Sequence, residues 1–143
     1  MKRSFLAIAL GLALATPAFA ANSPLDLVGP ISDYKIYVTD NLAKLTEQTQ
    51  AFTAAVKRGD LATARKLYAP TRVSYEQVEP IAELFSDLDA AIDSREDDHE
   101  QGVKSEDFTG FHRLEYALFT QNTTEGQGPV ADKLLADVKD LQA

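Results

Sequence analysis

Apolar residues recur every three or four positions along most of the chain after residue 30. The first such stretch predicts an amphipathic helix of about seven turns, because this spacing places its apolar side chains on one stripe. The stripe comprises Ile31, Tyr34, Val38, Leu42, Leu45, Thr49, Phe52 and Val56. We expect Gly59 to end this helix, since glycine is common just beyond a helix C-terminus.

The same spacing continues after Asp60, which is a suitable N-cap, through about residue 85. Pro70 and Pro80 interrupt this second helical pattern. Proline lacks a backbone donor and its ring clashes with the preceding turn. We therefore expect kinks or a break rather than one straight helix.

The remaining pattern is also helical. Residues 86–101 are acidic and predict a loop with a short helical turn around 88–92. Further helices are expected over Ser105–Thr120 and Pro129–Ala143, joined by a turn-rich segment at 122–128. No stretch alternates polar and apolar residues with a period of two, so no sheet is expected. The pattern predicts an all-α fold, arranged as an antiparallel four-helix bundle.

The N-terminus has the features of a secretory signal peptide. Charged Met1–Arg3 precede an apolar run over Phe5–Ala15, and small residues end at Ala20. The run is shorter than the roughly 20 apolar residues that a membrane anchor needs. The pattern predicts a signal peptide over 1–20 that is cleaved after Ala20, and hence export to the periplasm.

Two further segments complete the predicted organisation. Residues 21–30 are expected to form a leader without regular structure, because they contain Pro24, Gly29 and Pro30. Residues 31–143 would then form the helical bundle.

Composition narrows the function. The chain has 14 Lys+Arg against 22 Asp+Glu, a formal net charge of −8. Loss of Lys2 and Arg3 with the signal peptide leaves 12 − 22 = −10. This charge argues against a nucleic-acid partner and suits cations or cationic partners. The absence of cysteine excludes disulfides, thiolate catalysis and thiolate metal sites.

The sharpest chemical feature is an H-x-x-E spacing formed by His112 and Glu115. On a helix, Glu115 falls inside the apolar arc of Phe111, Leu114 and Leu118, where a carboxylate is unfavourable unless it is paired or coordinated. His and Glu three residues apart can offer a metal two ligands. The alternative is a buried His–Glu hydrogen bond that only holds the bundle together, and the spacing alone leaves both open.

A second feature is an acidic strip beside Tyr75. Glu76, Glu79 and Glu83 share one helix face with Arg72. Such oxygen-rich clusters suit hard cations. The alternative is a solvated helix face stabilised by an Arg72–Glu76 pair one turn apart.

Three aspartates, Asp87, Asp89 and Asp93, follow and can fold back onto this strip. Signatures of catalysis are sparse: the chain has no H-E-x-x-H, no Ser–His–Asp pattern and no Gly-rich phosphate loop.

Three segments closely resemble the imelysin-like family, in particular its EfeO/EfeM branch of periplasmic iron-uptake components. They are Ala69–Glu83, Asp87–Asp93 and Thr109–Glu115, and they come in the family's order. The resemblance implies an all-α fold of two four-helix bundles. It also implies that His112 and Glu115 form the family's H-x-x-E metal motif.

The resemblance further implies a function and partners. Glu76, Glu79 and Asp93 match acidic positions of a proposed metal cluster, and we expect Arg72 to orient a carboxylate. The expected function is capture of iron for a membrane permease, within an EfeUOB-type system that also contains a haem peroxidase. Zinc, copper or calcium are other possible cations.

Two alternatives remain from the resemblance. Close relatives are described as binding alginate, and an acidic polysaccharide would need a basic patch, for which Lys57, Arg58, Arg65 and Lys66 are available. The family also carries a peptidase label. We expect no enzyme activity, because only Glu115 is available as a general base.

The chain departs from the family pattern at both ends. Only a short leader precedes the helices, where the usual EfeO has a cupredoxin-like domain. Family members continue for roughly another hundred residues past the position of Ala143, so we expect this chain to correspond to the first half of a two-bundle domain.

Overall fold

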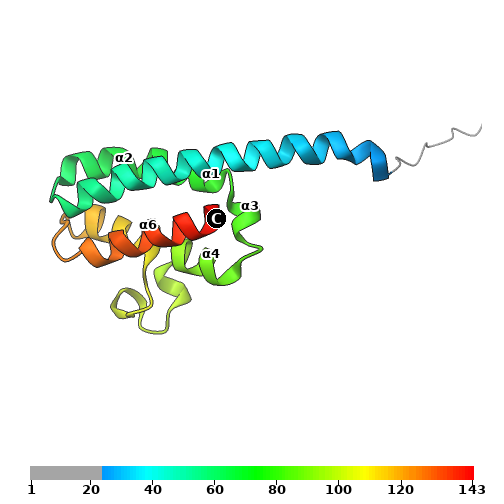
Figure 1. Ribbon diagram of the computed structural model, residues 1–143. Coiled ribbons are helices and arrows are strands. Elements are labelled where there is room, and N and C mark those ends of the chain that lie inside the picture. Colours follow the sequence, from blue (N-terminus) through cyan, green and yellow to red (C-terminus); the bar gives the residue numbers. More distant parts are fainter. Residues whose placement is uncertain (1–23) are drawn as a thin grey trace, which may run out of the picture.

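The computed structural model describes residues 24–143. The predicted signal peptide lies outside the described residues. Within them the protein is helical and contains no β-strand (Figure 1). The α-helices are α1 (Val28–Lys57), α2 (Leu61–Glu76), α3 (Glu79–Ala82), α4 (Ser86–Asp93), α5 (Gly110–Glu115) and α6 (Gly128–Gln142). Short 3₁₀ turns occupy Pro24–Leu27, Glu96–Asp98 and Gly102–Lys104, and a π-helical turn covers Tyr116–Thr120.

The leader prediction was wrong for its last residues. A 3₁₀ turn covers Pro24–Leu27 and α1 begins at Val28, three residues before the predicted start. Pro30 is the third residue of α1. A proline in the first helical turn removes no intrahelical hydrogen bond, because the first backbone N–H groups of a helix have no partner there.

The connection between α1 and α2 follows the prediction. Gly59 adopts a positive φ of 76° after the last turn of α1. The Asp60 side chain accepts a hydrogen bond from the Thr63 backbone N–H at 3.0 Å and so caps α2. Pro70 lies inside α2, which continues to Glu76. The helix ends there, and Pro80 lies in the first turn of the next helix, α3.

The core lies where α1 packs against α2 and α6 (Figure 1). Aromatic rings from three elements meet at its centre: Phe52 of α1, Tyr68 of α2 and Phe111 of α5 have centroids within 5.9–6.4 Å of one another. Leu134 and Val138 of α6 are fully buried against the same cluster. This core fixes the spacing between α2 and α5, the two helices that carry most of the predicted site residues.

The predicted helix over Ser105–Thr120 is only partly present. Its α-helical part is limited to Gly110–Glu115, and a π-helical turn follows. The reason is a close approach of backbones: Gly110 has φ 74°, and a Cβ at this position would lie 2.2 Å from the Ile92 carbonyl oxygen. A helix running through residues 105–110 cannot form that contact.

The all-α class is therefore confirmed for residues 24–143, but a regular four-helix bundle is not. The long helix α1 packs against the long helices α2 and α6, and the short helices α3, α4 and α5 take the place of a fourth long helix. The short segment α4 spans Ser86–Asp93, close to the predicted turn around 88–92.

The first turns of α1 extend beyond the other elements (Figure 1). These turns, together with Leu27 of the preceding 3₁₀ turn, expose a group of large apolar side chains: Leu27, Val28, Ile31, Tyr34, Ile36 and Tyr37. No helix within residues 24–143 combines the length and apolar character needed to cross a bilayer.

Candidate metal centre

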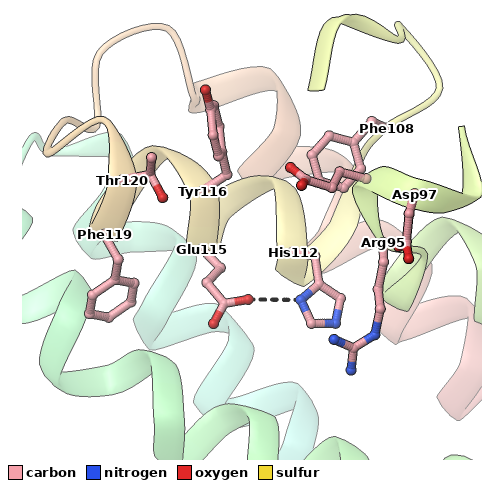
Figure 2. A pocket seen from close by; sticks show the side chains of 9 residues that line it. Arg95, Asp97, Phe108, His112, Glu115, Tyr116, Phe119 and Thr120 are labelled. Atoms are coloured by element: carbon pink, nitrogen blue, oxygen red, sulfur yellow. Dashed lines mark hydrogen bonds and ion pairs between the residues drawn. The ribbon is translucent and has the colours of Figure 1, made fainter. Parts of the chain in front are cut away.

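His112 and Glu115 form a direct contact on α5. The imidazole Nδ1 lies 2.8 Å from a carboxylate oxygen of Glu115. A dashed line marks this contact in Figure 2. The His112 side chain is only 12% exposed, whereas that of Glu115 is 44% exposed. The pair thus presents a buried nitrogen and a carboxylate that solvent can reach.

Asp93 approaches the other side of the imidazole from the end of α4. Its carboxylate lies 3.4 Å from His112 Nε2, and this nitrogen is buried without a hydrogen-bond partner within residues 24–143. The approach depends on the contact at Gly110, because Ile92 precedes Asp93 and Gly110 lies two residues before His112. The Thr109 hydroxyl also donates to the Ala91 carbonyl at 3.0 Å. The backbone contact between α4 and α5 therefore sets the distance between Asp93 and His112.

Arg72 of α2 lies between the acidic residues. Its guanidinium forms ion pairs with Asp93 and with Glu76. It also lies over the rings of Tyr75 and Phe111, at 5.3 and 5.4 Å from their centroids. A cation held by two carboxylates and two aromatic faces is strongly restrained.

Burial and mutual repulsion perturb two carboxyl groups here. Burial raises the pKa of Asp93, while the positive charge of Arg72 opposes that rise. Burial also raises the pKa of Glu79, and a hydrogen bond and the charge of Glu76 add to the rise. The two carboxylic acids therefore hold their protons more tightly than free side chains do.

A pocket opens beside the His112–Glu115 pair. It encloses about 490 Å³ and is lined by nine residues of two segments: Arg95, Glu96, Asp97, Phe108, His112, Glu115, Tyr116, Phe119 and Thr120. Figure 2 shows Glu115 and His112 facing it from one side, with the Arg95 guanidinium below the imidazole. The pocket thus gives solutes access to the motif.

The fit of a metal ion can be judged from the donors. Metal–nitrogen and metal–oxygen bonds of about 2.0–2.2 Å hold neighbouring ligands roughly 3 Å apart. The 2.8 Å separation of Nδ1 and the Glu115 oxygen therefore needs only a small adjustment to bridge one ion. Within residues 24–143 no three His, Asp or Glu side chains are arranged to hold a metal together. The described residues fit a two-donor site.

Comparison with known proteins gives the family. A model of the imelysin family, which carries a peptidase label, matches residues 30–143. The chain belongs to the imelysin family. The resemblance that the three sequence segments indicated is thereby confirmed.

Relatives of this chain are named as components of iron uptake systems. The chain is 74% identical to the iron uptake system component EfeM of Pseudomonas syringae pv. syringae, over 99% of this chain and 51% of that protein. It is 64% identical to the component EfeO of Yersinia pseudotuberculosis, over 81% of this chain and 31% of that protein. It is 55% identical to the component EfeO of Escherichia coli (UTI89 / UPEC), over 87% of this chain and 33% of that protein. The chain therefore spans about half the length of the EfeM relative and a third of the EfeO relatives.

All six site residues predicted from the sequence of this imelysin-family chain lie in one connected cluster. Glu79 lies next to Glu76, and Glu76 forms an ion pair with Arg72. Arg72 also forms an ion pair with Asp93. Asp93 lies beside His112, which contacts Glu115. Their role as metal ligands, and that of Arg72 as an orienting group, stays a prediction. The side chains of Glu83 and Asp87 are exposed and form no hydrogen bond or ion pair within the described residues.

Sequence reasoning did not identify two tyrosines, Tyr68 and Tyr75, that lie beside this cluster of site residues. Burial raises the pKa of the Tyr68 hydroxyl, and the charge of nearby Glu115 adds to the rise. The Tyr75 hydroxyl donates to Asp89 at 2.5 Å, and burial likewise raises its pKa. A signal for Tyr68 was present, because it precedes Arg72 by one helical turn and so shares a face with it.

Arg65 was also missed as a support of the site. Its guanidinium donates to the Leu118 carbonyl oxygen, at 2.9 Å from Nε, and to the Asn122 side chain at 2.6 Å. These bonds hold the π-helical turn that follows Glu115 and carries Phe119 to the pocket. Such turns leave carbonyl groups without their usual partner, and π-turns are frequent at functional sites.

Proposed function

We propose that this protein captures iron in the periplasm and delivers it to a membrane permease, with a haem peroxidase as a further member of the uptake system. The names of the relatives support an iron-uptake role. The observation that carries the proposal is the His112–Glu115 pair at the edge of an open pocket. The signal-peptide pattern at the N-terminus supports the compartment.

The surroundings of His112 suit a transition metal. A metal-binding histidine usually donates its other ring N–H to a carboxylate, which fixes the orientation of the ring. With the cation between Nδ1 and Glu115, Nε2 would carry the proton and face Asp93 at 3.4 Å. Arg72 would in turn hold Asp93 in place. In this arrangement Asp93 and Arg72 are positioning residues.

The donor types also favour one class of cation. A nitrogen ligand disfavours calcium, which prefers oxygen donors only. Iron, zinc and copper accept mixed nitrogen and oxygen ligands. Glu76 and Glu79 would act as ligands only after Glu76 leaves Arg72.

The test is equilibrium dialysis of the purified protein against Fe²⁺ under anaerobic conditions, followed by Zn²⁺ and Cu²⁺. His112→Ala should weaken binding at least about tenfold, because it removes a direct ligand. His99→Ala is the matched control, since His99 is the second histidine of the chain and hydrogen bonds with Ser94 instead. Circular dichroism of each variant checks that the helices persist.

Two outcomes decide the proposal. Weaker binding in His112→Ala with unchanged binding in His99→Ala supports it. Identical binding by wild type and His112→Ala would overturn it, and the pair would then have only a structural role.

The alternative functions have less support in the geometry. Two of the four basic residues considered for an acidic polysaccharide already have partners: Lys57 forms an ion pair with Asp132 at 2.5 Å, and Arg65 holds the π-turn. For a peptidase, Glu115 would have to serve both as a ligand and as the general base.

A further inference from the structure

The site offers too few protein donors for a metal ion. His112 and Glu115 supply two, and within the described part of the chain no third His, Asp or Glu completes a group that can hold a cation. Transition metals in proteins usually have four to six ligands. A cation at this pair therefore keeps several positions for ligands that residues 24–143 do not supply.

The space beside the pair is much larger than an ion requires. The pocket encloses about 490 Å³. A water molecule occupies about 30 Å³ in the liquid, whereas sites for small organic ligands enclose about 300–1,000 Å³. The volume suits a cation that arrives with a small ligand attached.

The walls of the pocket carry both signs of charge. Arg95 contributes a guanidinium that forms no ion pair within residues 24–143. It faces the same space as His112 and Glu115 (Figure 2). Glu96 and Asp97 also line the pocket and would repel a lone anion. A complex that places its cation beside Glu115 and its anion beside Arg95 would complement both the negative and the positive side chains of the pocket.

We propose that the pocket binds the metal together with a small carboxylate-type oxyanion, which completes the coordination of the cation and forms an ion pair with Arg95. The guanidinium fork matches a carboxylate with two parallel hydrogen bonds. Phe108, Tyr116 and Phe119 line the remaining walls of the pocket. This inference rests on the proposed function and adds the chemical form in which the cation is bound.

Two sources could supply the same oxyanion chemistry: a polycarboxylate such as citrate, carried with the iron, or free bicarbonate. Equilibrium dialysis with labelled iron and labelled citrate measures how many anions the protein retains per iron. A parallel arm replaces citrate with labelled bicarbonate. Dialysis of each labelled anion without iron provides the background.

The expected result is one retained anion per bound iron, from one of the two arms. Arg95→Gln should lower this anion retention at least about tenfold, because a charge-assisted bidentate pair is lost. Arg58→Gln is the matched control: it removes the same charge from an exposed arginine at the end of α1, outside the pocket. It should retain the anion as wild type does.

The outcomes separate the two proposals. Iron bound without either anion, or anion retention unchanged in Arg95→Gln, would overturn this inference and leave the proposed function standing. Failure to bind iron under every condition would overturn both.

Discussion

The two halves of α1 carry the same apolar spacing but have different surroundings. In the second half Leu42, Leu45 and Phe52 are buried against α2 and α6. In the first half Ile31 and Tyr34 are 51% and 47% exposed. Amphipathic spacing therefore predicts which face of a helix is apolar, but not whether another element covers that face.

The largest expected effect tests this difference directly. Phe52→Ala should lower the free energy of unfolding by about 3–5 kcal/mol, because it removes the ring that packs on Tyr68 and Phe111 and leaves a cavity. Tyr34→Ala, in the exposed half of the same helix, should change it by less than about 0.5 kcal/mol. Urea unfolding followed by circular dichroism measures both. Equal losses would show that the first half of α1 is covered in solution.

Two glycines provide a second comparison. Gly110→Ala should destabilise the protein by about 2–4 kcal/mol, because the backbone conformation is unfavourable for alanine and the new Cβ meets the Ile92 carbonyl. Gly29→Ala places a methyl group in open space within α1 and should be neutral or slightly stabilising, by at most about 1 kcal/mol. Thermal melts of both variants provide the measurement. A Gly110→Ala protein as stable as wild type would contradict the close contact between α4 and α5.

The smallest expected effect is a pH dependence of the folding stability that arises from Asp93. Because the pKa of Asp93 is raised above the ordinary value of 3.8 for an aspartate, the folded state keeps the proton to a higher pH than the unfolded state does. This contribution to stability is fully present below pH 3.8 and is lost as the pH rises through the raised pKa. Asp93→Asn does not titrate, so its stability relative to wild type should improve over that window.

Unfolding free energies measured across the acidic pH range would show whether stability falls as the pH rises. An NMR titration of the Asp93 carboxyl group would show whether its pKa is raised. Parallel stability curves for wild type and Asp93→Asn would show that burial does not perturb the group.

Elements with a long repeating pattern could be predicted from the sequence. The apolar spacing located α1, α2 and α6, and Asp60 marked the start of α2 correctly. Of the two prolines, Pro70 does not end α2, which continues to Glu76, whereas the helical pattern breaks just before Pro80. The short helices α4 and α5 depend on a contact between distant backbones, which local spacing does not encode.

The candidate site shows the same division. The His112–Glu115 contact was predictable because it joins residues one helical turn apart. The approach of Asp93 to His112 joins two helices, and neither the spacing nor the resemblance, which grouped Asp93 with Glu76 and Glu79, predicted it. Arg95 belongs to an acidic loop that has no periodic pattern, so no signal placed it opposite His112.

The tight backbone contact at residue 110 also affects how sequence motifs should be interpreted. The glycine lies two residues before the histidine of H-x-x-E, so any signature built around this segment will include it. Its presence is required by the junction of α4 and α5, whatever the pocket binds. A homologue that has lost His112 but kept Gly110 would therefore retain the fold without the proposed chemistry. Matches to the extended signature should be weighted by the histidine and the glutamate.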